Sequence, residues 1–253
     1  MTPGWFDLPA PLFDLVDRAL AAAVPGVLRV TLYGLAISYL GMVLYARLSN
    51  QQRLRAVQRL TRRVRARLHD PDIEFDALLA ASKRSLVLSL RHLGLVLLPS
   101  LVTLLPLLFV LPWLSNRFGS ELPAPGTSLT WCVHPIERAV DVRIGNAVLD
   151  DHGCVQAPWP ERSLPITLRG DTIANAPWHG ASGVLHARRW WNRLIGNPAG
   201  ELPKTVGDLE IHVALPEQSL LGFGPAWLGQ WLFWFLFPGL IAGLYWRWRW
   251  KLV

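Results

Sequence analysis

Two cysteines and two histidines are the residues of this sequence that could bind a metal ion. They form the patterns Cys132-x-His134 and His152-x-Cys154. Alternate residues of a β-strand share one face, so an antiparallel pairing of the two segments would bring all four side chains to one zinc or copper ion. In an oxidising compartment the two cysteines would instead form a disulfide with each other. The spacing leaves both possibilities open, and we expect no cofactor because metal ligands usually cluster more tightly.

Motifs of chemical catalysis are not found in the sequence. It lacks the G-x-S-x-G, Walker, H-E-x-x-H and dinucleotide-binding patterns. The histidines and carboxylates between residues 115 and 222 have spacings that select no reaction. An intramembrane hydrolase would need a serine, histidine or aspartate deep in a span, and the apolar segments described next hold no acidic residue. We therefore expect that the protein is not an enzyme.

The composition is typical of an integral membrane protein. Of the 253 residues, 51% are hydrophobic and 17% are charged, whereas soluble domains carry about 25% charged residues. This excludes a disordered chain and a small disulfide-rich scaffold. Residues 25–48, 86–114 and 223–246 form apolar segments, and crossing a bilayer takes about 20 such residues. The sequence therefore predicts three transmembrane helices.

The distribution of basic residues indicates how these segments are oriented. The net charge is +7, and its excess of arginine and lysine lies in residues 49–85 and in the tail 247–253. The arm 1–24 and the region 115–222 hold more acidic than basic residues. Because cytoplasmic loops collect lysine and arginine, we expect a multi-pass protein of a bacterial-type inner (plasma) membrane, with its N-terminus outside and its C-terminus in the cytoplasm.

The basic segments suggest lipid and the ribosome as partners. Anionic lipid headgroups attract basic residues that lie next to the ends of membrane spans. Specific nucleic-acid binding is not expected, because the longest basic segment is held between two spans rather than forming a separate domain.

The connecting segments are predicted to fold on the two sides of the membrane. From Pro11 onward the arm is amphipathic, which favours a helix on the outer surface over a disordered tail. Residues 49–85 predict a helical hairpin, with Asp70-Pro71 between its two helices. The first helix of the hairpin repeats apolar residues and one threonine on one face, namely Leu54, Val57, Thr61, Val64 and Leu68.

Residues 115–222 predict a β-rich, sandwich-like domain. Apolar and polar residues alternate from Leu209 to Leu215, as in a half-buried strand, and residues 144–147 and 169–171 are typical of hairpin turns. Trp190 and Trp191 fit either the membrane surface or the domain core. The predicted fold class is a mainly α membrane protein with three transmembrane helices, a cytoplasmic helical hairpin and an extracytoplasmic β-rich domain.

Small and polar residues follow one face of the first apolar segment and part of the second. In the first segment, a repeat of three and four residues comprises Thr31, Gly34, Ser38, Gly41 and Tyr45. In the second, Ser89 and His92 follow a similar repeat beside the charged Arg91. Such a stripe is typical of a helix-packing seam, which we favour, and the alternative is one wall of a polar groove. Arg91 either extends to the cytoplasmic headgroups or lines that groove.

Taken in order, the elements resemble those of the Oxa-type insertase superfamily, which includes YidC and the insertase subunit of the ER membrane complex. The likeness is closest to the short, three-span members, and it covers the first half of the chain and the last span. The residues that carry it are Tyr39-Leu40-Gly41 through Arg53-Leu54-Arg55, Asp70-Pro71, Leu98-Pro99 and Leu105-Pro106-Leu107-Leu108-Phe109. An outer domain replaces the brief connection of the short members, which suggests a specialised partner or client.

The resemblance implies a function in inserting or assembling membrane proteins. In that family the spans enclose a polar groove that is open to the cytoplasm, and a positive charge in it attracts the client. Carried over to this sequence, the groove residues would be Arg91, His92, Ser89, Ser38 and Thr31, and the basic hairpin would receive clients or contact the ribosome. The alternative is a non-catalytic scaffold or accessory subunit, whose outer domain binds a partner protein. The polar stripe separates the two, because an insertase exposes it to water and a scaffold buries it between helices.

Overall fold

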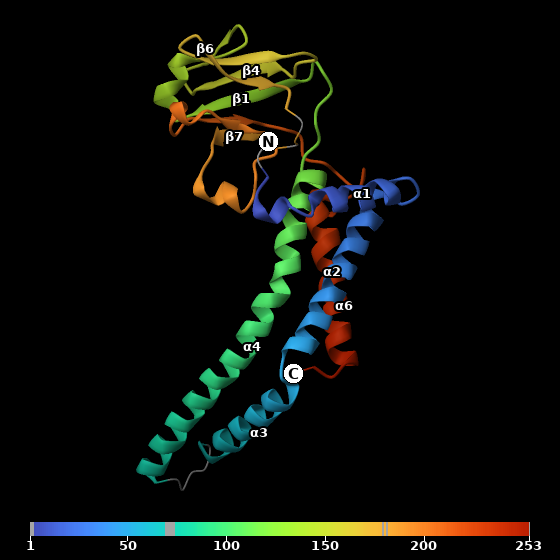
Figure 1. Cartoon of the computed structure of the whole chain (residues 1–253), viewed down its shortest axis with the longest axis vertical. Coiled ribbons are helices and arrows are strands. Elements are labelled where there is room, and N and C mark those ends of the chain that lie inside the picture. Colours follow the sequence, from blue (N-terminus) through green and yellow to red (C-terminus); the bar gives the residue numbers. More distant parts are fainter. Residues whose placement is uncertain (1–2, 69–73, 179, 181, 253) are drawn as a thin grey trace. The chain divides into compact units, whose positions relative to one another are not determined.

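A computed structural model describes residues 3–68, 74–178, 180 and 182–252 (Figure 1). The chain divides into two compact units. The first, which we call the sandwich unit, consists of Met1–Arg29 and Phe109–Phe233. The second, which we call the helical unit, consists of Val30–Leu108 and Trp234–Val253. Three helices contribute residues to both units.

Helices form in the arm, in the apolar segments and in the basic hairpin. In chain order they are η1 (Trp5–Asp7), α1 (Ala10–Ala21), α2 (Gly26–Leu48), α3 (Gln51–Leu68), α4 (Phe75–Phe118), α5 (Ala226–Gly229) and α6 (Trp231–Arg249). Among the described residues, α2 and α4 are long and apolar enough to cross a membrane, with mean hydropathies of 1.7 and 2.5 over an 18-residue stretch of each. The arm forms the helix that its amphipathic pattern predicts, and α6 begins later than the third apolar segment.

The longest helix, α4, joins two segments that the sequence analysis treats separately. Its 44 residues extend for about 66 Å at 1.5 Å per residue, whereas the hydrocarbon core is about 30 Å thick. The second helix of the hairpin and the second apolar segment are therefore one continuous helix. The predicted helix boundary at Asp70-Pro71 and the neighbouring Asp72 lie outside the described residues.

Residues 115–222 fold into two β-sheets, which confirms the predicted β-rich domain. The strands are β1 (Ser128–His134), β2 (Val142–Ile144), β3 (Ala147–Val148), β4 (Cys154–Pro158), β5 (Leu164–Leu168), β6 (Asp171–Ala176), β7 (Val184–Ala187), β8 (Glu201–Leu202) and β9 (Glu210–Val213). One sheet has the order β4-β1-β9-β7-β8 and the other has the order β3-β2-β5-β6. Short 3₁₀ helices connect them, namely η2 (Ile136–Asp141), η3 (Trp190–Arg193) and η4 (Lys204–Val206).

The inner faces of both sheets form one core, as in a β-sandwich. Burial alternates along β1, where Leu129, Trp131 and Val133 are buried. Trp131 is fully buried and its ring lies 5.8 Å from that of Trp159, which in turn lies 5.4 Å from that of Trp178. Aromatic pairs at these distances add stabilisation beyond their buried area.

Candidate functional site

Two residues of the polar stripe, Gly34 and Ser38, pack against α6, and the two helices run side by side in Figure 1. Gly34 is buried, and a Cβ atom at this position would collide with the backbone carbonyl oxygen of Phe235. A Cβ on Gly239 would lie 3.1 Å from the Gly34 carbonyl oxygen, and a Cβ on Gly243 would lie 3.1 Å from Ser38 Oγ. Small residues on both helices thus permit their backbones to approach closely. Ser38 belongs to this α2–α6 seam.

Thr31 lies one turn before Gly34 on the same face of α2. Its hydroxyl oxygen is buried and has no hydrogen-bond partner within the described part of the chain. At the other end of the seam, the ring of Tyr39 lies 5.3 Å from that of Trp246. The seam therefore includes an aromatic contact, and the unsatisfied Thr31 hydroxyl, judged within the described residues, lies one turn before its first close approach at Gly34.

The three predicted groove residues of α4 do not lie on one face. Leu88 packs with Val57 and Val64 of α3, together with Ala81 and Leu95 of α4. His92 is four residues after Leu88 and three before Leu95, so it lies on the α4 face that packs against α3. Its ring nitrogen Nδ1 is buried and has no hydrogen-bond partner among the residues that the structure describes.

Arg91 has a different environment from its two neighbours. Ser89 and His92 are half-buried, whereas the side chain of Arg91 is exposed. Val87 and Leu98, which share its side of the helix, are exposed as well. Arg91 thus lies between exposed apolar side chains, and its long aliphatic stem allows the guanidinium to extend away from them. The structure does not bring it together with Ser38 and Thr31 on α2.

The hairpin helix α3 presents a strongly basic surface. It carries seven arginines and no acidic residue, and its buried side chains Leu54, Val57 and Val64 lie on one face. Arg55 Nη2 donates a hydrogen bond of 3.1 Å to the backbone carbonyl of Lys251 in the C-terminal tail. The two basic segments therefore meet, as expected if both lie on the cytoplasmic side.

In the sandwich unit, Asp17 of α1 is the centre of a buried charge cluster that the sequence analysis did not identify. Its Oδ1 lies 2.6 Å from Arg29 Nη1, and its Oδ2 lies 3.0 Å from Arg117 Nε. The Arg29 guanidinium lies 5.4 Å from the centroid of the Phe118 ring. Arg29 Nε makes no hydrogen bond within the described residues, but its charge is compensated by Asp17. The signal in the sequence is an arginine inside an apolar segment, which requires a counter-ion.

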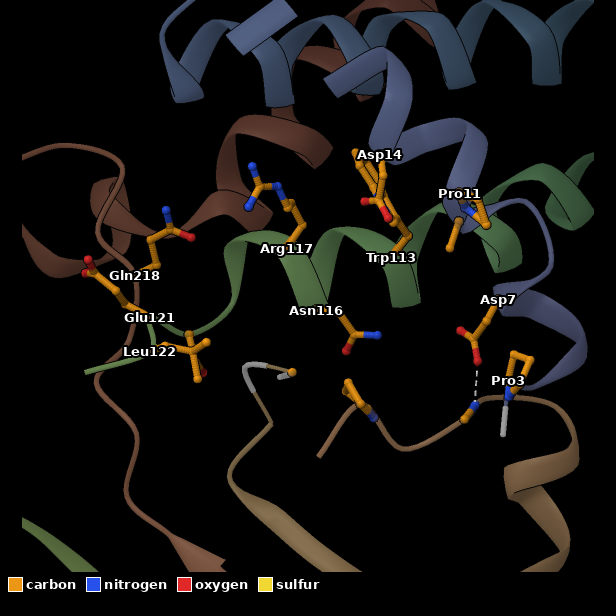
Figure 2. A pocket seen from close by; sticks show the side chains of 15 residues that line it. Pro3, Asp7, Pro11, Asp14, Trp113, Asn116, Arg117, Glu121, Leu122 and Gln218 are labelled. Atoms are coloured by element: carbon orange, nitrogen blue, oxygen red, sulfur yellow. Dashed lines mark hydrogen bonds between the residues drawn. The ribbon is translucent and has the colours of Figure 1, made fainter. Parts of the chain in front are cut away.

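The other two acidic residues of the arm also have partners. Trp113 Nε1 donates a hydrogen bond of 2.8 Å to Asp14 Oδ1. Asp7 Oδ2 accepts bonds from the backbone amides of Gly4 at 2.9 Å and of Gly196 at 2.6 Å. The arm is therefore bonded to the C-terminal part of α4 and to the β-domain (Figure 2).

These contacts border a cavity of about 770 Å³ within the sandwich unit. Figure 2 shows side chains from the arm, from the C-terminal part of α4 and from the loops of the β-domain around it. Its lining includes the carboxylates of Asp7, Asp14 and Glu121 and the guanidinium of Arg117. The lining thus carries three carboxylates and only one guanidinium, so the cavity favours cationic over anionic groups.

Cys132 and Cys154 are joined by a disulfide in the structure. They are directly opposite each other on β1 and β4, with an S–S distance of 2.10 Å. The sulfurs are therefore not available as thiolate ligands. The ring of His134 lies 4.9 Å from that of His212, and His152 lies in the turn that precedes β4. Within the described residues, no group of three or more histidine, cysteine or acidic side chains could hold a metal ion.

One carboxyl of the β-domain has a shifted pKa. A hydrogen bond of 3.0 Å with the His212 ring lowers the pKa of Glu210 below its ordinary value. The guanidinium of Arg189, which is paired with the same carboxylate, lowers it further. Partial burial acts in the opposite direction but does not outweigh these contacts.

No protein-family model, curated protein or solved structure matches this chain significantly. The resemblance to the Oxa-type insertases therefore depends on the order of the elements and on the residues given above.

Proposed function

We propose that the chain is an integral membrane protein with three spans, α2, α4 and α6, and with an outer β-domain. The apolar composition of α2 and α4 supports the first two spans. For α6, support comes from its exposed leucines, such as Leu240, and from the tryptophans at both of its ends. The basic α3 and C-terminal tail would then lie in the cytoplasm, at a bacterial-type inner membrane.

We further propose that the protein assists the insertion or assembly of other membrane proteins. The observation that carries this proposal is the buried Nδ1 of His92, which has no hydrogen-bond partner among the described residues and lies on the α4 face that packs against the basic hairpin helix. A buried polar atom without a partner costs about 1–3 kcal/mol. Polar groups of a client segment, or water that accompanies it, would satisfy this atom where the hairpin meets the inner leaflet.

The mechanism would be physical rather than chemical. A charged side chain at the centre of a bilayer costs about 2.5–3.5 kcal/mol on insertion scales. Polar side chains at the inner leaflet, here Ser89 and His92, would lower this cost for a passing segment. The arginines of α3 would hold anionic lipid headgroups or the ribosome near the site.

Site-specific photo-crosslinking in living cells tests this proposal. A photoreactive amino acid is placed at position 89 or 92, and the matched control carries it at position 98, an exposed position on the same helix. We expect many different nascent membrane proteins to be captured from positions 89 and 92 and far fewer from position 98. Capture of one fixed partner, or equal capture from all three positions, would contradict the proposal.

The second candidate function is a non-catalytic scaffold or accessory subunit. It is favoured by the α2–α6 seam, because Gly34 and Ser38 pack against α6 instead of lining an open groove. In this case the outer β-domain would bind one partner protein. Crosslinking from the cavity residue Glu121 to a single partner, with no client captured from position 92, would support the scaffold over the insertase.

A further inference from the structure

A surface of exposed aromatic and aliphatic side chains joins the arm to the β-domain. It consists of Trp5 and Leu8 around η1 and of Trp190, Trp191, Leu194 and Ile195 in and after η3, and we call it the η1–η3 patch. Trp5 and Trp190 are 69% and 74% exposed. Exposed apolar surface that is contiguous usually marks a contact with another molecule or with a membrane.

The two halves of the patch are held together by hydrogen bonds. The backbone amide of Phe6 donates to the carbonyl oxygen of Leu194 at 2.9 Å. The backbone amide of Gly196 donates to the carboxylate of Asp7 at 2.6 Å. Figure 1 shows this loop, drawn in orange after β7, next to the blue N-terminal segment. The patch is therefore one surface within the sandwich unit.

The position of η1 along α4 indicates what covers this surface. The ring of Phe6 lies 5.4 Å from that of Phe109, in an edge-on contact. Phe109 belongs to the apolar part of α4 and precedes Trp113 by four residues, or about 6 Å along the helix axis. If α4 crosses the membrane and Trp113 lies at its outer interface, η1 lies at the depth of the outer leaflet. Because Leu194 is bonded to η1, the η3 loop lies there too.

The residue types of the η3 loop match the chemistry of that environment. Tryptophan prefers the membrane interface, where its ring is partly in hydrocarbon and its N–H remains hydrated. Arg193 is exposed in the same loop, and its guanidinium suits the phosphate of a phospholipid headgroup. We propose that the η1–η3 patch inserts into the outer leaflet and so holds the β-domain against the membrane surface. This inference rests on α4 being a membrane span and does not depend on the insertase function.

Nitroxide labelling of the full-length protein tests this inference. Trp190→Cys and Ile195→Cys variants are labelled without reduction, so that the Cys132–Cys154 disulfide stays closed. They are reconstituted into vesicles of phosphatidylethanolamine and phosphatidylglycerol. The accessibility of each label to oxygen, which partitions into lipid, is compared with its accessibility to a water-soluble nickel chelate. Val140→Cys, at a position that is 89% exposed on η2 of the same domain, is the matched aqueous control. Leu98→Cys on α4 is the lipid control.

We expect the ratio of oxygen to nickel accessibility at positions 190 and 195 to be several-fold higher than at position 140 and to approach that at position 98. A ratio at 190 and 195 equal to that at 140 would overturn the inference. Protection from both reagents, or spin–spin broadening between labels, would also overturn it, because a partner protein or a second copy would then cover the patch. If the label at position 98 proves accessible to nickel, α4 is not a span and the inference fails with it.

Discussion

The two units differ in how they compensate buried polar side chains, although one buried atom of the sandwich unit, Arg29 Nε, also makes no hydrogen bond within the described residues. In the sandwich unit, the buried carboxylate of Asp17 is matched by the guanidinium groups of Arg29 and Arg117. In the helical unit, the hydroxyl of Thr31 and Nδ1 of His92 are buried without a hydrogen-bond partner in the described part of the chain. A paired charge holds structural elements together, whereas an unpaired polar atom reduces stability and is therefore the better candidate for function.

Removing the carboxylate of Asp17 should have the largest effect. Asp17→Leu leaves the nearly buried Arg29 without its counter-ion, so we expect the free energy of unfolding to fall by about 3–5 kcal/mol. Thermal unfolding of the purified protein in detergent measures this loss. The double variant Asp17→Leu with Arg29→Met should recover much of it, because an apolar pair replaces the ion pair. An Asp17→Leu protein as stable as wild type would show that the charge cluster is not structural.

Opening the disulfide should have the next largest effect, and only on the sandwich unit. Cys132 and Cys154 are 22 residues apart in sequence, and a cross-link over such a loop contributes about 3 kcal/mol. The double variant Cys132→Ser with Cys154→Ser should therefore unfold its β-domain at a lower denaturant concentration. Wild-type protein treated with a reductant should behave in the same way. If neither treatment shifts the unfolding midpoint, the bridge does not stabilise the domain.

The α2–α6 seam is tested by a pair of glycine substitutions. Gly34→Ala introduces a methyl group that collides with the carbonyl oxygen of Phe235, so we expect a loss of about 1–3 kcal/mol, as for other overpacked sites. Gly94→Ala on α4 is the control, because nothing lies within 4 Å of its Cβ position. This control should be neutral or stabilising by up to about 1 kcal/mol, since alanine favours helix. Unfolding of the purified proteins in detergent measures both effects. If the two substitutions changed the stability equally, Gly34 would not pack closely against α6.

Acid should destabilise the β-domain through Glu210, with a smaller effect. The pKa of Glu210 is lower in the folded protein than in the unfolded chain. Its contribution to the free energy of unfolding is therefore complete above the ordinary carboxyl pKa and is lost as the pH falls through the lowered value. Unfolding of the wild type measured along a pH series below about 5 should show this loss. The stability of the Glu210→Gln variant should depend less on pH in that range. If the stabilities of the variant and the wild type depended on pH in the same way, Glu210 would not be the cause of the acid effect.

Patterns of neighbouring residues correctly predicted elements that depend on neighbouring residues alone, such as turns and strands. The turn at Arg169-Gly170 joins β5 to β6 with φ values of 53° and 96°, which is the positive-φ geometry expected of a two-residue hairpin loop. The alternation around Leu209–Leu215 gave a strand at Glu210–Val213. The second helix of the predicted hairpin and the predicted second span form one helix, because the residues after Phe75 continue in helical conformation to Phe118.

Long-range pairings could not be predicted in the same way. Asp17 and Arg117 are a hundred residues apart, and their contact depends on how the arm packs against the C-terminal part of α4. The register that places Cys132 opposite Cys154 depends on the pairing of β1 with β4, so the sequence left disulfide and metal site as alternatives. Likewise, the stripe of α2 indicated a close helix contact but did not identify α6 as the partner helix.

The most direct test of the functional proposal is the insertion of newly synthesised membrane proteins into vesicles that contain the purified protein, with wild type compared to His92→Leu. Replacing an unpaired buried polar group by an apolar one should leave stability unchanged or increase it, so a loss of activity would not reflect unfolding. We predict that His92→Leu inserts clients several-fold more slowly than wild type while its unfolding midpoint stays the same or rises. Insertion at the wild-type rate by a stably folded His92→Leu protein would contradict the proposal.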